Sequence, residues 1–194
     1  KEVYFVGVAM LILISIAILL LVWVKNKDTY ANREIVNTLI EQKKESQEKV
    51  NKETGSKAIQ ILPEYEKIWK SNSDFIGWIT ISNTPIDYPV MQTPKDEEHY
   101  LHLDFHQEKN ENGCLIMDTD SIVGVGVQEN QYENGSKPST NLIIHGHNMK
   151  SKDMFGSLIK YENHEYEKKY NMIQFDSLYE HRKYEVISVF YSKV

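Results

Sequence analysis

Residues 77–90 read GWITISNTPIDYPV, and this stretch indicates the kind of fold that the chain adopts. Two short apolar runs, Gly77–Ile81 and Ile86–Val90, lie on either side of residues 83–85 (Asn-Thr-Pro), which are typical of turns. The pattern predicts two strands joined by a short connection. Such a pair is a building block of sheets and barrels.

The rest of the second part of the chain continues this pattern of short strands. The further predicted strands are Gly113–Met117, Leu142–His145, Met172–Phe175 and Tyr184–Tyr191. The predicted helices are short: one packs through Ile59, Leu62, Tyr65, Ile68 and Trp69, and two more cover Met154–Tyr161 and Glu165–Tyr170. Many short strands with few long helices favour a mainly β fold, a barrel or a sandwich, over a βαβ fold.

The first part of the chain is different, because Val3–Val24 contains no charged residue. At ~1.5 Å per residue the run spans roughly 33 Å as a helix, enough for a hydrocarbon core of ~30 Å. A cleaved signal peptide is the alternative, but its apolar core usually has only ~7–15 residues and precedes a small-residue cleavage site. We therefore expect a transmembrane anchor over residues 1–27. The flanking charges do not settle its orientation.

Residues 28–57 are polar and rich in charge, with a brief helical stripe at Ile35, Leu39 and Ile40. We expect an exposed helical stalk that ends in a linker at Gly55-Ser56 and holds the next domain off the membrane. The heptads do not persist, which disfavours a coiled-coil dimer. Residues 58–194 form the third predicted unit, a compact domain.

Composition excludes several classes of function. The chain has 194 residues and a formal net charge of −6, which argues against a nucleic-acid partner. Hydrophobic residues make up 41% and charged residues 26%, so the chain as a whole is not disordered. A single cysteine allows neither an intrachain disulfide nor a cysteine-based zinc cage.

His145 and His147 follow the apolar run Leu142–Ile144, which we expect to be buried. They lie on the same side of the strand if it continues, and on different sides if Gly146 bends it. The pair could serve in general acid–base catalysis, ligate a metal, or be structural. A metal would need further ligands. Asp104, Asp118, Asp120 and His106 are available, but the spacing selects none of them.

His99, His102 and His106 would share one face of a helix and could then bind zinc. The apolar pattern around them is instead that of a partly exposed connector, which disfavours such a site. Cys114 lies in a predicted buried strand, where a free cysteine is usually a small core residue. As a nucleophile it would need exposure and a cationic neighbour.

Neither arginine of the chain is a predicted catalytic residue. Arg33 belongs to the expected stalk. Arg182 lies in residues 179–183, which we expect to form a hairpin tip before the final strand, and its side chain is expected to be solvated.

Six motifs follow one another along the second part of the chain. They are NSDFIGWI at residues 72–79, TPIDYPVMQ at 84–92, Tyr100-Leu101, GCLIMD at 113–118, NLIIHGHNM at 141–149 and MFGSL at 154–158. In this order they resemble the sortase family, and its class B most. The resemblance covers roughly Leu62 to Val194, and the apolar span and the polar segment precede it in the family's usual order.

The resemblance implies a sortase-like β-barrel behind a transmembrane helix and a helical stalk. It also implies a single-pass protein of the cell membrane of a Gram-positive bacterium, with its compact domain on the extracellular face. Sortases are cysteine transpeptidases, and for this chain the resemblance implies no cofactor and no metal. A thiolate attacks a sorting-signal peptide to form a thioester, which an amine of a peptidoglycan precursor or a pilin resolves. His147 matches the family's catalytic histidine.

The chain also departs from the family. The family's catalytic cysteine ends a Thr-Leu-Ser-Thr-Cys-like strand well after the histidine, and its arginine follows on the next strand. Neither has a match here, since Val194 lies in what resembles the preceding strand, and Cys114 matches a core position. We therefore expect a barrel that is incomplete at its C-terminus and the first part of a sortase. The alternatives are an inactive module that only binds or assembles, and a metallohydrolase that uses His145 and His147.

Overall fold

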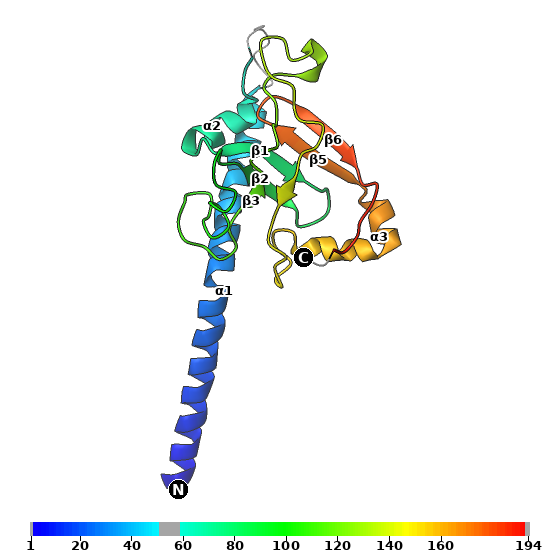
Figure 1. Ribbon diagram of the computed structural model, residues 1–194. Coiled ribbons are helices and arrows are strands. Elements are labelled where there is room, and N and C mark those ends of the chain that lie inside the picture. Colours follow the sequence, from blue (N-terminus) through cyan, green and yellow to red (C-terminus); the bar gives the residue numbers. More distant parts are fainter. Residues whose placement is uncertain (1, 51–58, 193–194) are drawn as a thin grey trace.

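The computed structural model describes residues 2–50 and 59–192, and a six-stranded sheet organises its compact part (Figure 1). The strands are β1 (Phe75–Thr80), β2 (Asp87–Met91), β3 (Leu115–Met117), β4 (Ile144–His145), β5 (Met172–Ser177) and β6 (His181–Glu185). Their order is β4-β3-β2-β1-β5-β6, and β2–β3 is the parallel pair among antiparallel neighbours. The sheet curves into a half-barrel, which confirms the predicted fold class.

The final predicted strand, Tyr184–Tyr191, is wrong in its bounds. β6 begins earlier and ends at Glu185, which pairs with Met172, the first residue of β5. One more backbone bond, from Val186 N to Asn171 O at 2.7 Å, extends the contact. Beyond it, β5 offers no further partner, so residues 187–191 are not a strand, and Ile187 is 95% exposed.

The helices are short apart from the first. They are α1 (Glu2–Val50), α2 (Pro63–Ser71) and α3 (His164–Lys169), with 3₁₀ turns η1 (Gln128–Asn130) and η2 (Gly156–Glu162). α2 begins at a proline, whose missing N–H would be unpaired at that position in any case. α3 begins after Asn163, whose side-chain oxygen accepts from the backbone N–H groups of Glu165 and Tyr166. Most of the predicted helix Met154–Tyr161 forms the 3₁₀ turn η2.

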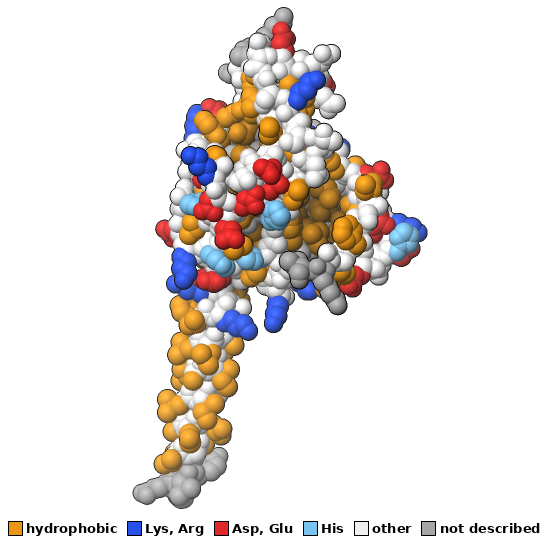
Figure 2. Space-filling model, in the orientation of Figure 1, with side chains coloured by type: hydrophobic (Ala, Val, Ile, Leu, Met, Phe, Trp, Pro, Cys, Tyr) orange, Lys and Arg blue, Asp and Glu red, His pale blue; other side chains and the backbone are white. Residues whose placement is uncertain are grey.

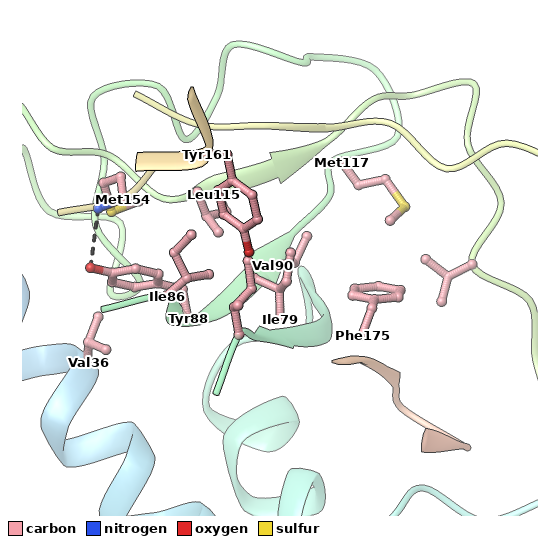
Figure 3. Packing of buried hydrophobic residues seen from close by; sticks show 12 residues of the cluster. Val36, Ile79, Ile86, Tyr88, Val90, Leu115, Met117, Met154, Tyr161 and Phe175 are labelled. Atoms are coloured by element: carbon pink, nitrogen blue, oxygen red, sulfur yellow. Dashed lines mark hydrogen bonds between the residues drawn. The ribbon is translucent and has the colours of Figure 1, made fainter. Parts of the chain in front are cut away.

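The sheet carries a hydrophobic cluster on each face, because side chains alternate along its strands. Ile79 and Phe175 point into one cluster, which β3 and the η2 segment complete through Leu115, Met117 and Tyr161 (Figure 3). The other cluster holds Trp78, Phe75 and Met91 against α1 and α2. Its α1 and α2 members are Leu39, Tyr65 and Ile68. These two layers fix the sheet that carries the candidate site.

α1 changes its surroundings along its length (Figures 1 and 2). Its first half is exposed and apolar, and by length and composition this helix could cross a membrane. Its second half packs on the domain, where Asn32, Val36 and Leu39 are buried. The expectation of an exposed stalk is therefore wrong between Asn32 and Leu39. The brief apolar stripe of this segment packs against the sheet and α2. The expected linker at Gly55-Ser56 lies outside the described residues.

Candidate functional site

The candidate site centres on His147, which follows the short strand β4. Gly146 separates His147 from His145, and a Cβ at Gly146 would lie 2.3 Å from Leu115 Cδ2. Any larger residue at position 146 would therefore require the side chains of Leu115 and Phe155 to shift. His145 is exposed within β4, opposite Ile116, whereas His147 lies beyond the end of the strand and is half-buried. Strand alternation thus does not extend to the second histidine.

The ring of His147 is oriented by one backbone group. Its Nε2 lies 2.8 Å from the carbonyl oxygen of Leu101. A carbonyl oxygen only accepts, so this hydrogen bond requires the proton on Nε2 and leaves Nδ1 as the acceptor of the neutral ring. Fixing one nitrogen in this way prepares the other to take up and release a proton.

The loop before β3, which also carries Leu101, supplies further neighbours of His147. The ring of His102 lies 5.7 Å from that of His147, and His102 Nδ1 lies 3.5 Å from Glu111 Oε2. His99, His102 and His106 lie in turns, not on one helix. Within residues 2–50 and 59–192 there is no group of three or more histidine, cysteine or acidic side chains placed to hold a metal.

Among the described residues, the acids considered as ligands form no metal site with the histidines. The Oδ1 atom of Asp104 accepts from the backbone N–H groups of His106 and Glu108, so this buried carboxylate shapes its own turn. Asp118 Oδ1 accepts from Ser121 N at 2.8 Å. Asp120 is exposed.

Cys114 is a core residue, as predicted. It is 6% exposed, and its Sγ lies 3.5 Å from the carbonyl oxygen of Leu103. Burial, and secondarily the neighbouring charge of Asp104, raises the pKa of the thiol far above its ordinary value. The thiolate needed for nucleophilic attack is therefore disfavoured at this position.

Residues 178–180 join β5 to β6 in a hairpin, as expected, but the expectation that Arg182 is solvated is wrong. Arg182 lies in β6 with 11% of its side chain exposed, and its Nε donates to Glu180 Oε1 at 2.7 Å. Glu180 also accepts from Gln128 N and Tyr132 OH, which belong to a loop some fifty residues earlier. Arg182 thus lies beside a carboxylate that binds a distant loop. No local sequence pattern predicts a contact of this kind.

The run Leu142–Ile144 is also less buried than expected, with Ile143 42% exposed. It borders an apolar hollow of about 720 Å³, which residues 186–190 line from the other side. Figure 2 shows hydrophobic side chains within this hollow. β4 is the last strand of the described sheet order, so its outer side has no neighbouring strand to cover it.

Sequence reasoning missed a second polar cluster, which lies beneath α2. Asp176 is 1% exposed and accepts from Tyr65 OH at 2.6 Å and from Gln174 Nε2 at 2.9 Å. The ring of His181 bridges two carboxylates, with Nδ1 3.1 Å from Asp176 Oδ1 and Nε2 3.4 Å from Glu64 Oε1. Its members come from α2, β5 and β6, so no local signal marked it.

The charges of this cluster are matched by partners. Burial alone would raise the pKa of Asp176, but hydrogen bonds from His181, Tyr65 and Gln174 hold it below its ordinary value. From α1, the Nζ of Lys43 lies 4.8 Å from the Trp78 ring centre and 5.3 Å from that of Tyr65. The cluster thus joins α1 and α2 to the sheet.

Comparison with known proteins identifies the family. No protein-family model matches the chain. Sortase B of Staphylococcus aureus (strain NCTC 8325 / PS 47) is 32% identical over 165 residues, which cover 80% of this chain and 61% of that protein. Sortase B of Listeria monocytogenes (serovar 1/2a, strain ATCC BAA-679 / EGD-e) is 37% identical over 103 residues, which cover 53% and 36%. The chain thus spans less than two thirds of either relative.

Solved structures agree with this result. Sortase B from Bacillus anthracis in complex with AAEK2 superposes with a TM-score of 0.67 at 27% identity, over 80% of this chain and 65% of that one. The Staphylococcus aureus sortase B–substrate complex shares the fold, with a TM-score of 0.62 at 24% identity over 83% and 63%. The half-barrel with its short helices is a sortase fold. The chain belongs to the class B sortases, as its motifs predicted.

Proposed function

We propose that this protein is a cysteine transpeptidase that cleaves a sorting signal and joins surface proteins to the cell wall, or pilins to each other. The observation that carries the proposal is the ring of His147 in a sortase fold. Its Nε2 bond to Leu101 fixes the ring and leaves Nδ1 for proton transfer. A positioned histidine of this kind serves as a general acid and base near neutral pH.

The proposed reaction has two steps. A cysteine thiolate attacks the carbonyl carbon of the scissile peptide bond, the C–N bond breaks, and the leaving amine takes a proton from His147. The acceptor amine then attacks the thioester, His147 takes up its proton, and the thiolate is released. The arginine of the family would stabilise the charge that develops on the carbonyl oxygen.

The proposal does not use Cys114 as the nucleophile, because burial disfavours its thiolate. Cys114 is the sole cysteine of the 194 residues. We therefore propose that the nucleophile and the arginine come from outside this sequence. The same observation favours a second candidate function, an inactive sortase-like module that binds peptide or assembles with another protein.

The proposed partners follow from the relatives. Structures of Staphylococcus aureus sortase B with a substrate and of sortase B with triglycine have been solved. For this protein we propose a sorting-signal peptide as donor, an amine of peptidoglycan precursor or pilin as acceptor, and no cofactor or metal. α1 would anchor it as a single-pass protein of the cell membrane, with the compact domain on the extracellular face.

The deciding experiment compares the 194-residue chain with the protein encoded by the reading frame past Val194. Each is incubated with a labelled sorting-signal peptide and triglycine, and cleavage and transfer products are measured. We expect transfer by the longer protein only, and a Thr-Leu-x-Thr-Cys motif followed by an arginine in its added residues. A stop codon directly after Val194, with no transfer, would support the inactive module.

In the active protein, His147→Ala should lower the rate of transfer by about 10²–10⁴-fold, the usual contribution of a positioned acid–base group. His145→Ala is the matched control, because this exposed histidine lies two residues away in β4. Circular dichroism on both variants checks that the fold is retained. Equal rates for His147→Ala and the unaltered protein would contradict the assignment, and a larger loss at His145 would move the role there.

A further inference from the structure

Two loops adjoin His147, and side-chain and backbone contacts hold both loops against the same short segment of α1. The first loop carries Leu101, whose carbonyl oxygen binds the ring of His147. The second loop begins after His147 and closes on it, because Phe155 N donates to the carbonyl oxygen of His147 at 3.0 Å. The position of the candidate site therefore depends on where these loops are held.

The first loop is held at Asp28 and Thr29. Asn110 Nδ2 donates to the backbone oxygen of Asp28 at 3.0 Å, and Glu111 N donates to the Asp28 carboxylate at 3.2 Å. Thr29 Oγ1 donates to Asn112 Oδ1 at 3.2 Å. These hydrogen bonds thus join the loop to two adjacent residues of the helix.

The second loop is held about one turn further along α1. Arg33 Nε and Nη2 donate to the two carboxylate oxygens of Asp153, each at 2.9 Å, which is a bidentate pair. Asn32 Nδ2 lies 3.6 Å from the sulfur of Met154. Further along, Leu39 is buried and Lys43 lies over Trp78, so α1 cannot pivot about these contacts.

These fastening points lie close to the end of the apolar half of α1. Val24 is its last residue, and the helix continues unbroken to Val50. At about 1.5 Å per residue, Asp28 is about 6 Å and Arg33 about 14 Å beyond Val24 along the helix axis. If α1 inserts up to Val24, both loops are held within reach of the lipid headgroups.

We propose that residues 108–112 and 148–154, the loop segments held by α1, form a membrane-facing rim that fits an anionic lipid surface, with α1 as a rigid support that sets the distance of the rim from the bilayer. The inference rests on the proposed anchoring by α1 and goes beyond the proposed reaction. Lys25 and Lys27 follow the apolar span, and they are exposed. The loops add three exposed lysines. These are Lys109, Lys150 and Lys152.

The charges on this rim favour anionic headgroups. The exposed acids of these two segments are Glu108 and Glu111, and Glu111 Oε2 lies 3.5 Å from His102 Nδ1. Three further exposed acids of the loop that carries Leu101 lie outside the segments held by α1; they are Asp96, Glu97 and Glu98. Asp153 is paired with Arg33, whereas the carboxylate of Asp28 accepts from a backbone N–H and keeps its charge. The five exposed lysines therefore outnumber the three remaining acids, Asp28, Glu108 and Glu111, and Figure 2 shows basic side chains where the apolar half of α1 meets the compact part.

The test measures how close the rim lies to a bilayer. The full chain is reconstituted in nanodiscs of phosphatidylglycerol and phosphatidylcholine that contain a nickel-chelating lipid. Nitroxide labels are attached at Lys109→Cys, Lys150→Cys and Glu129→Cys, with the unlabelled buried Cys114 left in place. Glu129 is the distant control, since η1 lies at the end of the domain away from the N-terminus (Figure 1).

We expect nickel at the headgroups to relax the labels at 109 and 150 at least severalfold more than the label at 129. Replacing the anionic lipid by phosphatidylcholine should reduce that difference. Arg33→Ala should also reduce it at position 150, whereas Glu34→Ala, at the neighbouring exposed residue, should not. Equal relaxation at all three positions, or failure of the chain to enter nanodiscs, would overturn the proposal. The measurement needs no peptide cleavage, so its failure would leave the proposed reaction standing.

Discussion

Two histidines of this chain, His181 and His147, are held by partners of different charge. His181 lies between the carboxylates of Asp176 and Glu64, at 3.1 and 3.4 Å. His147 is held by the neutral carbonyl group of Leu101, at 2.8 Å. Both rings are partly buried and both are fixed in orientation, so the charge of the partner is the main difference between them.

That difference separates the structural role of His181 from the chemical role that we propose for His147. Only the imidazolium can donate to both carboxylates at once, and the hydrogen bond with Asp176 accordingly raises the pKa of His181. A proton lost from His181 would leave one carboxylate facing a nitrogen lone pair. The carbonyl oxygen of Leu101 binds only one nitrogen of His147 and leaves Nδ1 as an acceptor. This arrangement supports the role in proton transfer that we propose for His147.

The largest effect should come from Asp176→Ala, which removes the centre of the His181 cluster. The donors of Tyr65, Gln174 and His181 would lose their acceptor in a buried position. We expect a loss of about 3–5 kcal/mol in the free energy of unfolding, as for other broken buried pairs. Urea unfolding in detergent, followed by tryptophan fluorescence, measures it. Asp120→Ala, at an exposed carboxylate, is the control, and a loss below about 1 kcal/mol for Asp176→Ala would show that the cluster is not structural.

A smaller effect should follow from Tyr65→Phe. The Tyr65 side chain is fully buried, and burial together with Asp176 raises its pKa, so it remains a neutral O–H donor to that carboxylate. Losing this one donor should cost about 1–2 kcal/mol, because Gln174 and His181 still bind Asp176. The same unfolding measurement applies. Tyr30→Phe, at a 60% exposed tyrosine, should have no comparable effect.

The comparison also predicts that His147→Ala costs little stability. The half-buried ring has one hydrogen bond to a neutral group, and its loss should reduce the free energy of unfolding by about 1 kcal/mol. A cost near that of Asp176→Ala would mean that His147 is itself a structural histidine. In that case the comparison, and with it the assignment of His147, would fail.

The parts of the fold that sequence predicted are those set by local patterns. The strands on either side of residues 83–85 follow from short apolar runs and turn residues, and Cys114 was placed in the core by its apolar neighbours. The motif around His147 pointed to the candidate site, but not to Leu101 as the group that orients the ring. That contact joins residues 46 positions apart.

The parts that sequence did not predict depend on contacts between distant residues. Tyr65 and Asp176 are 111 positions apart, and Arg33 and Asp153 are 120 apart. The sequence placed Tyr65 on the packed face of a helix and Arg33 in the stalk, but it named neither aspartate as the partner. Pairing over such separations becomes visible only in the assembled fold. The contacts of the second half of α1 were missed for the same reason.

The smallest expected effect is a pH dependence at His181. The folded state raises the pKa of His181 above its ordinary value of 6.5, first through the hydrogen bond with Asp176, against the opposing effect of burial. Its stabilising contribution is therefore fully present below pH 6.5 and is lost as pH rises through the higher pKa of the folded state. His181→Gln should thus cost more stability at about pH 5.5 than at about pH 8.5.

The groups that face His181 determine the sign of this prediction. Asp176 and Glu64 favour the imidazolium, whereas Lys43 of α1 disfavours it. Half of the side chain is exposed, so solvent screening keeps the effect below that of Asp176→Ala. Urea unfolding at the two pH values measures the change, and His106→Gln, at an exposed histidine, corrects for the general effect of replacing a histidine. A cost for His181→Gln that is equal at both pH values, or larger at the higher one, would show that the two carboxylates do not hold the ring as a cation. His181 and His147 would then no longer differ in the way that assigns proton transfer to His147.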